Sequence, residues 1–344
     1  MSDVNRQWLL AGRPDGSDTT IRDEHFKYNE AKKPAPGEGE FLVQNIYFSV
    51  DPAMQGWMRG IGDYMAPMEI GDVMLSGAVG RVVESNHAGF KAGEYVTGNF
   101  GWQDYYVSDG IDRNKAPVQK VPEGLPLKAF MGALGNTGLT AYFGLFDIGE
   151  PRAGDTILVS GAAGAVGSVA GQLGKIAGCK VIGIAGGKKK CDWIVNELGF
   201  DAAIDYKNED VDKRLGQLVP EGVNVFFDNV GGRILEAGLS HIAHRGRIAI
   251  CGGISGYTKL IPGPANYMQL VLKRCRMEGF IVVDYVHRFK EGRARLKKWM
   301  DEGALKQAVD VADGFEKTPA ALQGLFTGAN MGKQLVKVAE DPTA

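Results

Sequence analysis

The chain reads TILVSGAAGAVG over residues 156–167, and this stretch decides the fold. Its first five residues are apolar and β-branched, which predicts a buried strand over residues 156–160. The small residues that follow predict a tight turn leading directly into a helix. In such a turn Gly164 lets the backbone approach a pyrophosphate, and Gly167 lets the helix lie close to the strand. Ala162 stands where the G-x-G-x-x-G pattern of dinucleotide-binding turns has its first glycine, so the match is imperfect.

Strands and helices alternate downstream of this turn, which predicts a doubly wound parallel sheet of the Rossmann type in an α/β protein. Strands are expected at residues 156–160, 180–185, 202–206, 223–228, 247–252 and 277–283, and helices at 165–177, 188–198, 210–218 and 233–243. Gly167-x-x-x-Gly171 also fits a contact between membrane helices, but Lys175 and its charged neighbours follow too soon for a membrane span.

The first 125 residues are different, because short apolar runs are separated there by Gly, Pro and Asp turns and helical periodicity is weak. They predict a β-rich domain. After residue 302 we expect a helix at 319–326 and a strand at 334–338 that pack back onto this domain. The predicted organisation is therefore one domain made of residues 1–126 and 303–344, and a dinucleotide-binding domain of residues 127–302.

The composition excludes several classes of protein. Apolar residues make up 44% and charged residues 23%, which is typical of a globular chain. Lys and Arg number 39 against 41 Asp and Glu, so we expect no nucleic-acid partner. The uncharged stretches 129–146 and 156–174 reach membrane-span length but contain many Gly, Thr and Ser residues, so we expect buried segments and no membrane partner. The four cysteines form no C-x-x-C pair, which favours a reducing cytoplasm.

The end of the second predicted strand indicates which dinucleotide binds. An NAD-binding unit has an acidic residue there that holds the ribose 2′-hydroxyl. This chain has Gly187 followed by Lys188, Lys189 and Lys190 instead. Lysines at a helix N-terminus face the positive end of the helix dipole, which is unfavourable unless an anion lies nearby. The pattern therefore favours NADPH over NADH as the cofactor. The alternative is that the lysines are simply solvated and bind no phosphate.

The sequence predicts no metal site, because its potential ligands are not clustered. The five histidines are scattered, and the β-rich half contains no cysteine. His241 and His244 are close enough to share a metal ion, but without a third ligand we interpret them as exposed histidines near a helix end.

Several motifs taken together carry a resemblance that covers nearly the whole chain. They are SVDP (49–52), GLTAY (138–142), AAGAVG (162–167), FDNVGG (227–232), RIAICG (247–252), ISGY (254–257), EGFI (278–281) and NMGK (330–333). With them the chain resembles the medium-chain dehydrogenase/reductase superfamily. It is most similar to the zinc-independent branch that contains leukotriene B4 12-hydroxydehydrogenase/prostaglandin reductase, plant alkenal reductases and bacterial curcumin reductase. Zinc-dependent members have Gly-His-Glu near Ser76-Gly77-Ala78 of this chain, and its absence agrees with the scattered ligands.

The resemblance implies a GroES-like barrel domain for the substrate, a Rossmann domain for NADPH, a cleft between them and a homodimer. In it, Gly164 to Gly167 meet the pyrophosphate, while Lys190 and Tyr206 flank the 2′-phosphate. The full set of implied cofactor-binding residues is Thr140, Gly164, Ala165, Val166, Gly167, Gly187, Lys190, Tyr206, Asn229, Cys251, Gly252, Gly253, Ile254, Ser255, Tyr257, Phe280, Ile281, Val282 and Asn330.

The substrate pocket is where the chain departs from the family. Relatives commonly read Asp-Pro-Tyr-Met-Arg, whereas this chain has Ala53 and Gln55 at the third and fifth positions. These changes are expected to reshape the pocket, and Tyr64 is a candidate aromatic wall. The resemblance also implies that Tyr257 polarises the substrate carbonyl. A phenol with an ordinary pKa near 10 stays protonated at neutral pH, so it can donate a hydrogen bond.

Hydride transfer from a nicotinamide without a metal requires a carbon that is already electrophilic. The leading hypothesis is therefore an NADPH-dependent reductase of the C=C bond in α,β-unsaturated aldehydes and ketones. Two alternatives are a quinone oxidoreductase and an NADPH-binding stress or structural protein with little turnover. Either Tyr257 or water protonates the α-carbon.

Overall fold

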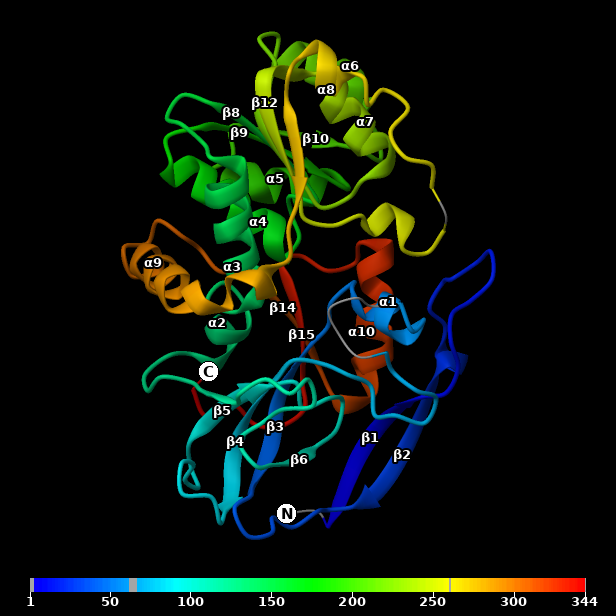
Figure 1. Ribbon diagram of the computed structural model, residues 1–344, viewed down its shortest axis with the longest axis vertical. Coiled ribbons are helices and arrows are strands. Elements are labelled where there is room, and N and C mark those ends of the chain that lie inside the picture. The colour runs from blue at the N-terminus through cyan, green and yellow to red at the C-terminus, as the bar shows by residue number, and fades with distance from the viewer. Residues whose placement is uncertain (1–2, 62–66, 260, 344) are drawn as a thin grey trace.

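A computed structural model describes residues 3–61, 67–259 and 261–343 of the chain. The described residues form two lobes (Figure 1). One lobe is built on a six-stranded parallel sheet, and the other on a seven-stranded sheet with a separate two-stranded ribbon.

The six-stranded sheet has the strand order of a Rossmann fold. Its order is β10-β9-β8-β11-β12-β13, and every neighbouring pair is parallel. Strands β9 and β10 lie on one side of β8, whereas β11 to β13 lie on the other, so the strand order reverses between β8 and β11. Ligands of open α/β sheets bind at such a point. The strands are β8 (Thr156–Ser160), β9 (Lys180–Ala185), β10 (Ala202–Asp205), β11 (Val223–Asp228), β12 (Ile242–Ile250) and β13 (Arg276–Gly279).

Helices cover both faces of this sheet, as strands that are apolar on both sides require. Ile157 and Val159 point to the face covered by α3, α4 and α9, whereas Leu158 points to the face covered by α6 and α7. The helices between residues 127 and 302 are α2 (Leu127–Met131), α3 (Asn136–Phe143), α4 (Ala165–Ile176), α5 (Lys188–Asn196), α6 (Val211–Leu218), α7 (Gly232–Ser240), α8 (Gln269–Leu272) and α9 (Phe289–Asp301), with the shorter helical segments η2 (Gly144–Gly149), η3 (Ile254–Gly256) and η4 (Val282–Arg288). Helix α2 packs against β3, β4 and β15 of the other lobe.

The second lobe is the β-rich one expected from the sequence, and a core that includes the fully buried Trp102, Phe41 and Phe48 holds it together. Its large sheet has the order β14-β15-β3-β4-β5-β7, with β6 also paired to β3, and β1 pairs with β2. The elements are β1 (Val4–Leu10), η1 (Asp23–His25), β2 (Phe26–Lys32), β3 (Phe41–Ser49), α1 (Met54–Met58), β4 (Ala78–Ser85), β5 (Tyr95–Gly98), β6 (Tyr105–Ser108), β7 (Gln119–Lys120), β14 (Val309–Asp313), η5 (Phe315–Lys317), α10 (Thr318–Thr327) and β15 (Lys333–Lys337).

The C-terminal segment packs back onto this lobe, which confirms the prediction for the tail. Strand β15 pairs antiparallel with β3, and α10 packs its buried Leu322 into the same core. The domain boundaries at residues 126 and 303 stay a prediction.

Three predicted elements, the helix 233–243 and the strands 247–252 and 277–283, differ from the structure by more than two residues at one end. The helix expected over residues 233–243 ends at Ser240, and β12 already begins at Ile242. Arg245 then has a φ of 59°, so β12 is irregular and only its second half has the predicted apolar pattern. The strand expected over residues 277–283 ends at Gly279, because Phe280 turns away to pack against Gly144.

Among the described residues, no helix is both long enough and apolar enough to cross a membrane.

We expect Gly167→Ala to destabilise the protein, because α4 lies too close to the preceding turn to admit a methyl group. A Cβ at this position would lie 2.3 Å from the Gly161 carbonyl oxygen. The free energy of unfolding, measured by urea denaturation, should fall by about 1–3 kcal/mol. Gly263→Ala is the matched control, because its Cβ would meet no heavy atom within 4 Å. Equal stability of the two variants would contradict the predicted close approach.

Candidate functional site

A hydrogen-bonded network joins the carboxyl ends of β8 and β11. The Ser160 hydroxyl donates to the Asp228 carboxylate at 2.5 Å, and it accepts the backbone N–H of Asn229 at 2.8 Å. The Asn229 side-chain amide donates to the Ser160 carbonyl oxygen at 2.7 Å. The network fixes the two strand ends on either side of the crevice, with Asn229 at its edge.

The turn between β8 and α4 leaves the start of the helix without a side-chain cap. Helix α4 begins at Ala165, and its N-cap residue Gly164 has no side chain to cap the first amides. The predicted residues Ala165, Val166 and Gly167 form the first turn of the helix. Their N–H groups and the positive end of the helix dipole can bind anionic oxygens.

Two lysine side chains, Lys190 and Lys207, lie near the glycines at the end of β9. Gly187 has a φ of 92° and is the N-cap residue of α5. A Cβ on the preceding Gly186 would lie 2.8 Å from the Tyr206 ring and 3.0 Å from Cε of Lys207, so both side chains lie over this glycine. Lys190 is half-buried, and burial together with the nearby Lys207 lowers the pKa of its ammonium group.

Two of the three consecutive lysines, Lys188 and Lys190, make different contacts. Lys188 is 85% exposed and pairs with Asp192 at 2.6 Å. Lys190 donates from Nζ to the Gly328 carbonyl oxygen at 2.9 Å. The structure therefore distinguishes Lys190 from its neighbour within the lysine run.

The tail also reaches the glycine turn. Gly332 donates its N–H to the Ala163 carbonyl oxygen at 2.8 Å and forms an isolated bridge with Gly164. Asn330, which the family resemblance implies near the cofactor, donates from its side chain to the Gly332 carbonyl oxygen at 2.9 Å. The two lobes thus meet directly at the predicted pyrophosphate site.

A second group of predicted residues lines one hollow of about 580 Å³, which we call the β12–β13 hollow. It is lined by Ile250, Cys251, Gly252, Gly253, Gly279, Phe280, Ile281 and Asp284. Five of these were predicted to border the cofactor, and the neighbouring Val282 begins η4. Burial raises the pKa of the Cys251 thiol to about 12, so this group is a neutral thiol at physiological pH and no nucleophile.

Tyr257 follows η3, on a loop attached to the strand ends described above. Ile254 donates its N–H to the Asn229 carbonyl oxygen at 3.3 Å, and the Ser255 hydroxyl donates to the Val230 carbonyl oxygen at 2.6 Å. A Cβ on Gly252 would lie 3.4 Å from the Tyr257 hydroxyl oxygen. The phenol therefore lies against Gly252, which lines the β12–β13 hollow.

The predicted pocket residues occupy different environments. Ala53 is the N-cap residue of α1 and is half-buried. The Gln55 side chain is buried, and its amide donates to the Thr19 carbonyl oxygen at 3.1 Å. Tyr64 lies outside the described residues. Thr140 lies within α3, where its hydroxyl donates to the Asn136 carbonyl oxygen at 2.7 Å. The assigned roles of these four residues stay predictions.

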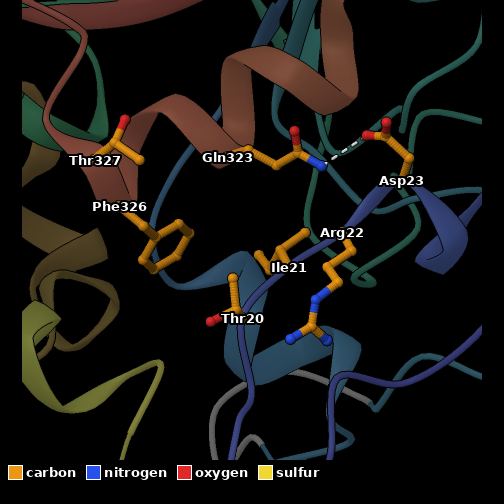
Figure 2. A pocket seen from close by; sticks show the side chains of 7 residues that line it. All are labelled: Thr20, Ile21, Arg22, Asp23, Gln323, Phe326 and Thr327. Atoms are coloured by element: carbon orange, nitrogen blue, oxygen red, sulfur yellow. Dashed lines mark hydrogen bonds between the residues drawn. The ribbon is translucent and has the colours of Figure 1, made fainter.

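A second hollow of about 330 Å³ lies between α10 and the segment after Thr19 (Figure 2). Ile21 and Phe326 supply apolar surface, and the Gln323 amide donates to Asp23 at 2.9 Å. The remaining lining residues are Thr20, Arg22 and Thr327.

The two histidines that the sequence left as candidate metal ligands have other neighbours. His241 lies 3.0 Å from an Asp212 carboxylate oxygen, and His244 accepts a hydrogen bond from the Arg274 guanidinium at 2.6 Å. Within the described ranges, no group of three or more His, Cys, Asp or Glu side chains is arranged to hold a metal ion.

Sequence reasoning missed three residues at the crevice. The Asp205 carboxylate accepts the N–H of Gly187 at 2.7 Å and so fixes the start of α5. Lys207 adds a second cation near Lys190. Asp205 lies within the predicted strand 202–206 and Lys207 directly follows it, so their positions could have been found. Thr19 contacts Tyr257 across 238 positions, and no local pattern indicates that contact.

This fold and crevice are those of a two-domain, dinucleotide-binding dehydrogenase or reductase. A family model described as the N-terminal domain of oxidoreductase matches residues 6–116, and one described as zinc-binding dehydrogenase matches residues 165–298. The chain belongs to the medium-chain dehydrogenase/reductase superfamily, in the branch of curcumin, alkenal and prostaglandin reductases.

Two curated relatives match over 98% of both chains. They are the NADPH-dependent curcumin reductase of Escherichia coli, at 40% identity, and the NADP(+)-dependent 2-alkenal reductase of Nicotiana tabacum, at 38%. Among solved structures, CurA of Vibrio vulnificus in complex with NADPH has a TM-score of 0.90 and 40% identity, covering 97% of this chain and 99% of that chain. The E. coli quinone oxidoreductase has a TM-score of 0.75 at 22% identity, which supports the fold alone.

Proposed function

We propose that this protein is an NADPH-dependent reductase that adds hydride to the C=C bond of α,β-unsaturated aldehydes and ketones. The relatives named as curcumin, 2-alkenal and prostaglandin reductases support a reductase of this kind. The observation that carries the proposal is the position of the Tyr257 phenol against Gly252, beside the β12–β13 hollow. A neutral donor at the edge of a dinucleotide crevice suits a substrate whose carbonyl must be polarised.

The residues at the crevice fit NADPH. The uncapped amides of α4 would hold the pyrophosphate, and Lys190, Tyr206 and Lys207 would surround the 2′-phosphate. The depressed pKa of Lys190 reflects burial and a like charge, and a phosphate dianion would relieve both penalties. When bound, NADPH supplies the hydride.

Tyr257 acts on the substrate carbonyl. Its phenol donates a hydrogen bond to the carbonyl oxygen, which makes the β-carbon more electrophilic and stabilises the negative charge of the enolate. The α-carbon then takes a proton, for which the Tyr257 hydroxyl and water are the two candidate sources. The Cys251 thiol, which lines the β12–β13 hollow, has its pKa raised to about 12, so it adds no competing nucleophile.

The proposed reaction uses no metal ion, since Ser76-Gly77-Ala78 replaces the Gly-His-Glu of the zinc-dependent members. We also propose that the protein is a cytoplasmic homodimer, as the family resemblance implies. All four cysteines are free, which is consistent with a reducing compartment.

The activity can be tested by mixing the purified protein with NADPH and a panel of 2-alkenals, enones and menadione. We expect NADPH oxidation with the alkenals and enones, and saturated carbonyl products by mass spectrometry. Higher kcat/KM for menadione than for any enone would favour a quinone oxidoreductase. Tight NADPH binding without turnover of any acceptor would favour a binding protein instead.

Tyr257→Phe removes the proposed donor and should lower kcat/KM for enones about a hundredfold, since one such donor contributes about 3 kcal/mol. The dissociation constant for NADPH, measured by nicotinamide fluorescence, should change less than about twofold. Tyr267→Phe is the control, because Tyr267 is 58% exposed. An unchanged kcat/KM in Tyr257→Phe would rule out the proposed role.

Lys190→Ala should raise the KM for NADPH about ten- to hundredfold, because it removes a charge-assisted hydrogen bond worth about 1.5–3 kcal/mol. The KM for NADH should change little, since that cofactor carries no 2′-phosphate. Lys188→Ala lies in the same helical turn but pairs with Asp192, so it should behave like the wild type. Equal effects of Lys190→Ala on both cofactors would refute the phosphate assignment.

A further inference from the structure

A buried chain of hydrogen bonds connects α1 with the Tyr257 loop. The Gln55 side-chain amide donates to the Thr19 carbonyl oxygen at 3.1 Å. The Thr19 hydroxyl donates to the Tyr257 carbonyl oxygen at 3.0 Å, and the Thr19 N–H donates to the Thr258 carbonyl oxygen at 3.3 Å. Thr19 therefore joins the two lobes through its hydroxyl and N–H groups, while its carbonyl oxygen is held by Gln55 of its own lobe.

Burial makes these contacts hard to replace with water. Thr19 is 4% exposed and Gln55 is 2% exposed. A buried polar group that loses its partner retains the full cost of leaving water. The neutral amide of Gln55 matches a carbonyl acceptor without adding a buried charge. Gln55 is also one of the two positions where the sequence departs from the Asp-Pro-Tyr-Met-Arg pattern.

The segment that leads into α1 is held near the glycine turn by Lys333. Helix α1 follows Asp51, whose carboxylate accepts a hydrogen bond from the buried Lys333 ammonium group at 2.6 Å. Lys333 also donates to the Val50 carbonyl oxygen at 3.0 Å. The adjacent Gly332 is hydrogen-bonded to Ala163 of the turn. The segment that carries Gln55 is therefore fixed near the glycine turn through Lys333. Through Thr19 it also contacts the Tyr257 loop.

We propose that Gln55 and Thr19 form a clamp that positions Tyr257 for the reduction. This inference rests on the proposed function, and it makes both residues positioning residues. The root of the Tyr257 loop is held by its own lobe, through the contacts of Ile254 and Ser255. Residues Tyr257 and Thr258 of the loop are held by the other lobe, through Thr19. Holding both ends keeps the phenol against Gly252, where it meets a substrate carbonyl.

The clamp can be tested with Thr19→Val, which removes the hydroxyl at nearly constant volume, and Thr19→Ser, which retains it. We expect Thr19→Val to lower kcat for an enone about tenfold while the KM for NADPH stays within about twofold. Thr19→Ser should restore kcat to within about twofold of the wild type. In a Tyr257→Phe background, Thr19→Val should have almost no further effect, since the clamp acts through the phenol. An unchanged kcat in Thr19→Val, or additive losses in the double variant, would overturn the proposal.

A second measurement does not depend on turnover. Amide hydrogen exchange of residues 254–259 in the cofactor-free protein should be several-fold faster in Thr19→Val and in Gln55→Met than in the wild type. Exchange in Thr19→Ser should match the wild type, and the thermal midpoint identifies any variant that fails to fold. Unaltered exchange in both Thr19→Val and Gln55→Met would refute the clamp. A wild-type protein that reduces no enone would refute the proposed function, and the exchange result would still decide whether the loop is clamped.

Discussion

The geometry of the crevice depends on the hydrogen bonds of the buried Asp228 carboxylate. This carboxylate is fully buried, and it accepts hydrogen bonds from the Ser160 hydroxyl and from the N–H groups of Val230 and Gly231. Burial raises the pKa of this carboxyl, while the three donors stabilise its charge. An unpaired buried carboxylate costs several kcal/mol, so these donors must stay in place. The ends of β8 and β11, and the loop that begins at Asn229, are thereby fixed relative to each other.

The two lobes are joined on both sides of this fixed point. On the phosphate side, Gly332 bonds to Ala163 and Lys190 bonds to the Gly328 carbonyl oxygen. On the other side, Thr19 bonds to the Tyr257 loop. Each of these contacts uses a backbone group on at least one partner. None of these contacts uses Ala53 of the predicted substrate pocket, so this residue can change without weakening the contacts between the lobes.

The parallel sheet could be predicted closely, because buried strands have a continuous apolar pattern in the sequence. The strands at residues 156–160, 180–185 and 223–228 are confirmed with their predicted bounds. The predicted end of the sixth strand was wrong, since Phe280 is apolar but packs against Gly144 outside the ladder. Within the site, the glycine turn and Lys190 have local patterns. Thr19 has none, because its role depends on a contact with a residue 238 positions away.

The pKa values around the crevice explain why a tyrosine suits the proposed role better than the cysteine beside it. With its pKa raised to about 12, Cys251 keeps its proton at physiological pH, as an ordinary phenol does. A thiol, however, is a weak hydrogen-bond donor, whereas a phenol is a good one. In the proposed reaction, charge that develops on a substrate oxygen would therefore be stabilised by Tyr257 and hardly at all by Cys251. Because a donor stabilises that charge only from the correct position, the contacts that hold the Tyr257 loop matter as much as the hydroxyl itself.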